Sequence, residues 1–112
     1  MEELAIAIIG LGLMGGSLGL ELSSWPRTKF IKGYDIDRKA AEKAKELGAV
    51  NFISPSLEEA AQGVDLVFLS LPVMSVPPVF LELRPHLSPS TRVLDLGSTR
   101  EWVWGEISPA LQ

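Results

Sequence analysis

The 112-residue sequence contains no cysteine and a single histidine, His86. Without cysteine the chain can form neither a disulfide framework nor a thiolate metal site. One histidine cannot build a metal centre alone. We therefore expect neither a metal site nor metal-dependent catalysis.

The sequence also lacks an excess of positive charge and a long apolar run. The formal net charge is −4, and the lysines and arginines are interspersed, so no basic stripe is present for nucleic acid. Residues 1–3 are acidic where a secretory signal would be basic. The longest mostly apolar stretch, residues 66–81, is interrupted by Pro72, Pro77 and Pro78 well short of a membrane span. We expect a soluble cytoplasmic protein that binds neither nucleic acid nor membranes.

The composition is that of one small globular domain. Apolar residues make up 46% of the chain, and a chain of this length has room for one hydrophobic core. There is no linker and no internal repeat, so residues 1–112 are expected to form a single domain.

The most informative motif is a glycine-rich turn that directly follows an unbroken apolar strand. Gly10, Gly12 and Gly15 have the spacing G-x-G-x-x-G. In dinucleotide-binding proteins the first glycine permits a tight turn, the second lets the backbone approach a pyrophosphate, and the third allows the helix to pack close to its strand. Backbone N–H groups at the start of that helix then point at the phosphates, here those of Leu13, Met14 and Gly15. The sequence predicts a dinucleotide site.

A carboxylate stands where a dinucleotide site needs one. Asp35 ends a second apolar strand, residues 30–35, twenty residues after Gly15. An acid at this place accepts hydrogen bonds from the adenosine ribose and repels a 2′-phosphate, which favours NAD over NADP. Arg38 could offer charge to a 2′-phosphate instead. Asp35 could also be a helix cap, although Asp37 is better placed for that role.

The rest of the chain alternates strands and helices. Expected strands are residues 4–9, 30–35, 49–53, 65–71 and 91–96. Expected helices follow the glycine turn and occupy residues 38–47, 57–62 and from Ser75 to about 85, with a last helical segment after Arg100. Gly48 would stop the second helix, and Ser56 with Glu59 forms a capping-box pattern before the third. Ser75 is expected to cap the fourth.

With right-handed crossover connections, this alternation predicts a doubly wound parallel α/β sheet of the Rossmann type. The predicted strand order is 3-2-1-4-5, with the fifth strand at the edge. The order reverses between strands one and four, so ligand should bind there, at the carboxyl ends of the strands. His86 precedes the fifth strand at the opposite end, and we expect it to be a surface or capping residue.

Four segments together resemble a known family. They are residues 10–18, Tyr34-Asp35, residues 71–73 and residues 95–100, and they look like the amino-terminal NAD(P)-binding domain of prephenate and arogenate dehydrogenases. The Gly-Gly-Ser of residues 15–17 and the Asp-x-Gly-Ser-Thr of residues 95–99 are the more specific marks. The 3-hydroxyisobutyrate-type dehydrogenases share Gly-Leu-Gly-x-Met-Gly and are the alternative.

The resemblance implies an oxidoreductase of tyrosine biosynthesis, which oxidises prephenate or arogenate with loss of the ring carboxylate. It further implies that Leu71, Pro72 and Ser98 contact the cofactor. Ser98 and Thr99 could equally be a simple helix cap, and Arg100 stands where the family most often has lysine.

The family's catalytic histidine and substrate-binding arginine belong to a further strand and a helical second domain. Neither is encoded before Gln112, so this chain is expected to be inactive alone, with no catalytic residue of its own. The family's homodimer is built mostly by that second domain. The chain could instead be a stand-alone NAD-binding module without catalysis.

Overall fold

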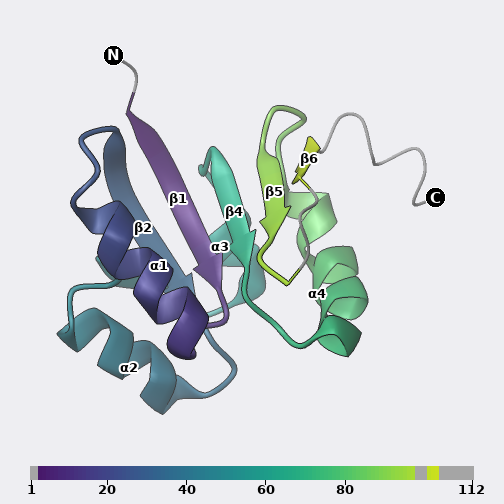
Figure 1. Ribbon diagram of the computed structural model, residues 1–112. Coiled ribbons are helices and arrows are strands. Elements are labelled where there is room, and N and C mark those ends of the chain that lie inside the picture. Colours follow the sequence, from purple (N-terminus) through teal and green to yellow (C-terminus); the bar gives the residue numbers. More distant parts are fainter. Residues whose placement is uncertain (1–2, 98–100, 104–112) are drawn as a thin grey trace.

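The computed structural model describes residues 3–97 and 101–103, and its strands and helices alternate along the chain (Figure 1). The strands are β1 (Leu4–Ile9), β2 (Thr28–Tyr34), β3 (Phe52–Ile53), β4 (Leu66–Leu69), β5 (Arg92–Asp95) and β6 (Glu101–Val103). The α-helices are α1 (Leu13–Ser23), α2 (Arg38–Glu46), α3 (Leu57–Ala61) and α4 (Val76–Leu83). Short 3-10 turns flank α4 at Val73–Ser75 and Arg84–His86.

The strands form one sheet in the order β3-β2-β1-β4-β5-β6. The pairs among the first five strands are parallel, so the predicted doubly wound sheet with order 3-2-1-4-5 is confirmed. The strand order reverses between β1 and β4, whose paired residues run from Ile6 opposite Leu66 to Ile9 opposite Leu69.

The expected helical segment after Arg100 is wrong where the structure describes it, because residues 101–103 form β6. This strand pairs antiparallel with β5, from Arg92 opposite Val103 to Leu94 opposite Glu101. Only residues 96–100 separate the two strands, which is too few for a crossover helix, so a return in the antiparallel direction is the pairing available. The expectation that the fifth strand is the edge of the sheet is therefore wrong, because β6 pairs with its free side.

Helices cover both faces of the sheet (Figure 1). Side chains alternate across β1, so Ala5, Ala7 and Ile9 pack with α3 and α4, while Ile6 and Ile8 pack with α1 and α2. A strand that buries both of its faces has to be apolar throughout, which is why the run 4–9 shows no polar alternation. Among the described residues, no helix has the length and apolar character needed to cross a membrane.

The helix caps agree with expectation at two of three positions. Asp37 accepts a hydrogen bond from the Lys39 N–H at 3.0 Å, and Ser56 accepts one from the Glu59 N–H at 3.2 Å. Ser75 makes no capping hydrogen bond through its side chain, so that expectation is wrong. The reason is local: the N–H groups that a cap would bind belong to the second and third helical residues, and here these are Pro77 and Pro78, which have none.

Candidate functional site

Two glycines of the turn are required by the fold itself. Gly10 has a φ of +96°, a conformation that residues with side chains rarely adopt. A Cβ at Gly10 would lie 2.1 Å from the Ser70 carbonyl oxygen, and one at Gly15 would lie 2.0 Å from the Gly10 carbonyl oxygen. These contacts bring the end of β1, the start of α1 and the end of β4 together without room for a methyl group.

Gly12 is different, because a Cβ there would meet no atom within 4 Å. The residue is exposed and is the N-cap of α1, with a negative φ of −72°. Since glycine has no side chain to cap the helix, the N–H groups of Leu13, Met14 and Gly15 have no capping side chain at the positive end of the α1 dipole. The fold does not require glycine at this position, but close approach of an anion would.

The carboxylate of Asp35 fixes the turn from the neighbouring strand. One oxygen accepts the Leu11 N–H at 2.7 Å, and the other accepts the Asp37 N–H at 2.8 Å. A carboxylate has about four lone-pair sites, so both oxygens can still accept further hydrogen bonds. Asp35 therefore joins the carboxyl ends of β1 and β2 and keeps acceptor capacity for a ligand.

A pocket of about 260 Å³ opens beside the turn and Asp35. It lies at the carboxyl ends of β1 and β2 and is closed by α3 and α4. Its lining residues are Ile9, Gly10, Tyr34, Asp35, Ile36, Leu57, Leu71, Ser75, Val79 and Glu82. This is the pocket at the reversal of strand order, where ligand was expected to bind.

The pocket brings together some of the predicted site residues and adds others. Gly10, Asp35 and Leu71 line it, and Pro72 follows directly. Ser98, with Thr99 and Arg100, lies outside the described residues. Sequence reasoning missed the contributions of α3 and α4, although the spacing of Ser75, Val79 and Glu82 by four and three residues places them on one helix face.

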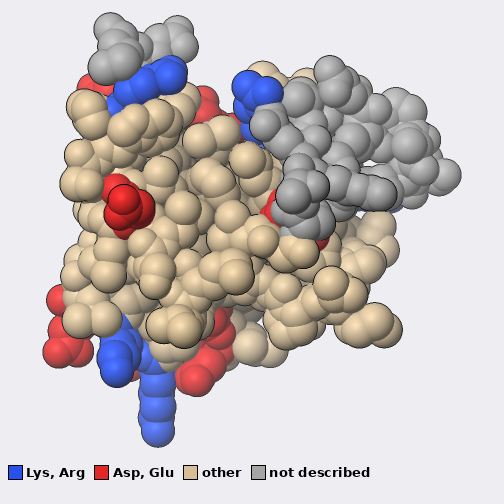
Figure 2. All heavy atoms as spheres, in the orientation of Figure 1, with Lys and Arg blue, Asp and Glu red and all other residues tan. Residues whose placement is uncertain are grey.

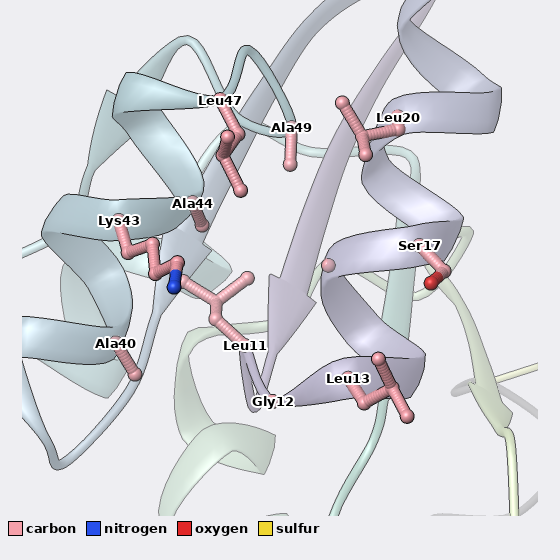
Figure 3. A pocket seen from close by; sticks show the side chains of 11 residues that line it. Leu11, Gly12, Leu13, Ser17, Leu20, Ala40, Lys43, Ala44, Leu47 and Ala49 are labelled. Carbon is pink, nitrogen blue, oxygen red and sulfur yellow. The ribbon is translucent and has the colours of Figure 1, made fainter.

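A second, larger groove of about 400 Å³ lies between α1 and α2 (Figure 3). It begins at Leu11, Gly12 and Leu13 and runs between small and aliphatic side chains of the two helices. Lys43 is the one charged residue of its lining, and most charged atoms on the face shown in Figure 2 lie near the margins. This groove has no carboxylate that could hold a ribose, so we assign the candidate site to the pocket that contains Asp35.

An ion pair joins β2 to α3. Lys32 Nζ lies 3.2 Å from Glu59 Oε1 and donates to the carbonyl oxygens of Glu59 and Gln62 at 2.8 Å each. The pKa of the Glu59 carboxyl is lowered, first by the Ser54 hydroxyl and then by Lys32, while burial acts in the opposite direction. The Ser54 hydroxyl is buried and outside hydrogen-bond geometry with other described residues, so the contact with Lys32 is the better defined cause.

His86 lies in the 3-10 turn that precedes β5, at the end of the sheet opposite the pocket. It does not line the pocket. No group of three or more potential metal ligands occurs among residues 3–97 and 101–103.

A glycine turn at the reversal point of a parallel α/β sheet, with a carboxylate at the end of the next strand, defines a nucleotide-binding domain of the Rossmann type. The model of the family "Prephenate dehydrogenase, nucleotide-binding domain" matches residues 18–112. The chain belongs to this family.

The chain is similar to individual dehydrogenases of this and of the alternative kind. The cyclohexadienyl dehydrogenase of Zymomonas mobilis is 28% identical over 95 residues, which are 85% of this chain and 32% of that protein. The prephenate dehydrogenase of A. aeolicus, solved with hydroxyphenyl propionate and NAD+, is 31% identical with a TM-score of 0.74, over 85% of this chain and 34% of that one. The 3-hydroxyisobutyrate dehydrogenase of Mycobacterium tuberculosis is 28% identical with a TM-score of 0.75, over 83% and 31%. This chain thus spans about a third of the length of these relatives.

Proposed function

We propose that this chain is the NAD-binding domain of a dehydrogenase and binds the dinucleotide across the glycine turn. The pyrophosphate lies against Gly12 and the N–H groups of Leu13, Met14 and Gly15. The observation that carries this proposal is the open space at Gly12, beside two glycines that the fold itself requires. The fold does not require glycine at position 12, so the room that its missing side chain leaves is explained by a ligand.

The adenosine half occupies the pocket on the other side of the turn. Asp35 accepts hydrogen bonds from the ribose hydroxyls, and the base lies between Ile36 and the side chains of Leu71 and Val79. Ile36 supports this placement because its apolar side chain is 93% exposed at the pocket lining. By the resemblance to the family, Pro72 and Ser98 also contact the cofactor.

NAD is the proposed cofactor in preference to NADP. The negative charge of Asp35 would repel a 2′-phosphate on the ribose that it binds. The candidate for a compensating cation, Arg38, is paired with Glu42 at 3.7 Å on the exposed side of α2. This favours a ribose with free hydroxyls.

For the whole protein we propose oxidation of prephenate or arogenate. In this reaction NAD would supply the hydride acceptor for the hydrogen on the ring carbinol carbon. The bond to the ring carboxylate breaks to release carbon dioxide, its electron pair completes the aromatic ring, and the carbinol oxygen becomes the phenol hydroxyl. The family match supports this substrate class. A 3-hydroxyisobutyrate-type hydroxyacid dehydrogenase is the second candidate, supported by the similarity to the Mycobacterium tuberculosis enzyme.

The cofactor proposal is tested by titrating NAD into the 112-residue chain and into its Gly12→Ala and Gly12→Val variants. Calorimetry should show binding to the parent chain, weaker binding to the alanine variant and none to the valine variant, because the added carbons fill the pyrophosphate space in steps. Urea unfolding should show that all three chains are folded, since nothing lies within 4 Å of a Cβ at this position. Equal NAD affinity in folded parent and valine variant would show that the pyrophosphate is bound elsewhere.

A further inference from the structure

We infer that Glu82 recognises the exocyclic amino group of adenine and so selects NAD over dinucleotides with another base. The inference rests on the proposed function, because it takes the pocket beside Asp35 as the adenosine site. It adds a residue of α4 that determines which base is accepted.

Glu82 belongs to a stripe of α4 that lines the pocket. Val79 and Glu82 follow Ser75, the N-cap of the helix, at spacings of four and three residues, so the three lie along the same face. Val79 gives this face an apolar surface, and Glu82 adds a carboxylate one turn further along. The helix therefore offers the base a flat apolar contact followed by a hydrogen-bond acceptor.

The two carboxylates of the pocket have different surroundings. Asp35 is bound through both oxygens to the Leu11 and Asp37 N–H groups, which places it at the glycine turn and the ribose. Glu82 is exposed and forms no ion pair or side-chain hydrogen bond with another described residue. It is consequently the carboxylate of the lining whose oxygens are uncommitted.

The base has one group that fits such an acceptor. Asp35, Val79 and Glu82 line the same pocket, so a base attached to a ribose at Asp35 can meet α4 with the edge farthest from the sugar. In adenine this edge carries an amino group, which is a hydrogen-bond donor. An ionised carboxylate only accepts hydrogen bonds, so Glu82 attracts an amino group and repels a carbonyl oxygen at the same position.

Nicotinamide hypoxanthine dinucleotide tests this pairing, because its base carries a carbonyl oxygen where adenine carries that amino group. Both dinucleotides are titrated by calorimetry into the parent chain, the Glu82→Gln variant and the Glu21→Gln variant. Glu21 is an exposed residue of α1 outside the pocket lining, so its variant controls for the loss of one surface charge.

The parent chain and the Glu21→Gln control should prefer NAD by about tenfold, the effect of one hydrogen bond to a charged acceptor. In Glu82→Gln the preference should fall to within about twofold of unity, because an amide can also donate to the hypoxanthine carbonyl. If Glu82→Gln still binds NAD and keeps the parent's preference over the hypoxanthine dinucleotide, the role of Glu82 is overturned and the proposed function is not. Failure of the parent chain to bind either dinucleotide would overturn the proposed function as well.

Discussion

Gly15 and Gly16 are neighbours in α1, yet an added methyl group would meet different surroundings at each. At Gly15 it would lie 2.0 Å from a carbonyl oxygen of the turn, whereas at Gly16 it would meet nothing within 4 Å. We expect Gly15→Ala to lower the free energy of unfolding by about 2–3 kcal/mol through overpacking. Gly16→Ala should raise it by about 0.5–1 kcal/mol, because alanine loses less backbone entropy in a helix. Urea unfolding of the two variants measures both effects, and equal destabilisation would contradict the close contact at Gly15.

Asp35 gives a second prediction at the residue scale. Asp35→Ser removes the charge that disfavours a 2′-phosphate together with the acceptors for the ribose hydroxyls. The affinity for NAD should therefore fall by about tenfold or more, the value of a charged hydrogen bond, while that for NADP falls less. Calorimetric titration of both cofactors gives the comparison. Equal losses for the two cofactors would exclude the ribose role and leave Asp35 as a support of the turn.

The sequence predicts some residues of the candidate site better than others. Gly10 and Asp35 were identifiable because a fixed spacing and a strand end define them locally. Val79 and Glu82 were not, since they reach the pocket only when α4 packs against the strand ends. The hydrogen bond from the Leu11 N–H to Asp35 joins residues 24 apart in the sequence, so no local sequence pattern predicts it.

Among the elements, α3 depends on a charge from the neighbouring strand. The lowered pKa of Glu59 means that the folded chain favours the ionised carboxyl. Its stabilising effect is therefore present above the ordinary glutamate pKa of 4.5 and is lost as the pH falls through the lowered value. The Glu59 side chain is 44% exposed, so solvent screening limits the effect to about 1 kcal/mol or less.

We therefore expect Glu59→Gln to lower the free energy of unfolding at pH 7 and to have little effect near pH 3. Urea unfolding at the two pH values measures this difference. Because Lys32 contributes to the lowered pKa, the same change in a Lys32→Met background should show a smaller dependence on pH. A Glu59→Gln effect that is equal at both pH values would contradict the ion pair as its cause.

Elements with a strong local pattern were predicted well from the sequence. β1 was expected at residues 4–9 and found at Leu4–Ile9, because a doubly buried strand is apolar without interruption. β6 has three residues, too few for an alternating pattern, and its pairing with β5 exists only in the folded sheet. The expected strand at 49–53 shortened to Phe52–Ile53 for a related reason, since only these residues pair with β2.

At the scale of the whole molecule, the lining of the candidate pocket offers few groups for catalysis. Its lining contains no histidine and no arginine, so neither an imidazole base nor a guanidinium clamp for a substrate carboxylate is present there. Such groups normally lower a barrier by several kcal/mol each.

We expect the purified 112-residue chain to produce no NADH from prephenate or arogenate. Absorbance at the NADH band, followed with each substrate and saturating NAD, provides the measurement. Steady NADH production that disappears in Gly12→Val would show that this chain carries its own catalytic groups.

The hydrogen bond between the Leu11 N–H and Asp35 also makes one amide a reporter on the site. An amide in a surface turn usually exchanges its hydrogen with solvent quickly, but Leu11 is buried and its N–H donates to a carboxylate at 2.7 Å. Exchange there requires the ends of β1 and β2 to separate, so its rate reports how often this corner of the sheet opens. Deuterium uptake at the Leu11 amide thus measures how often the glycine turn separates from the end of β2, without any ligand being added.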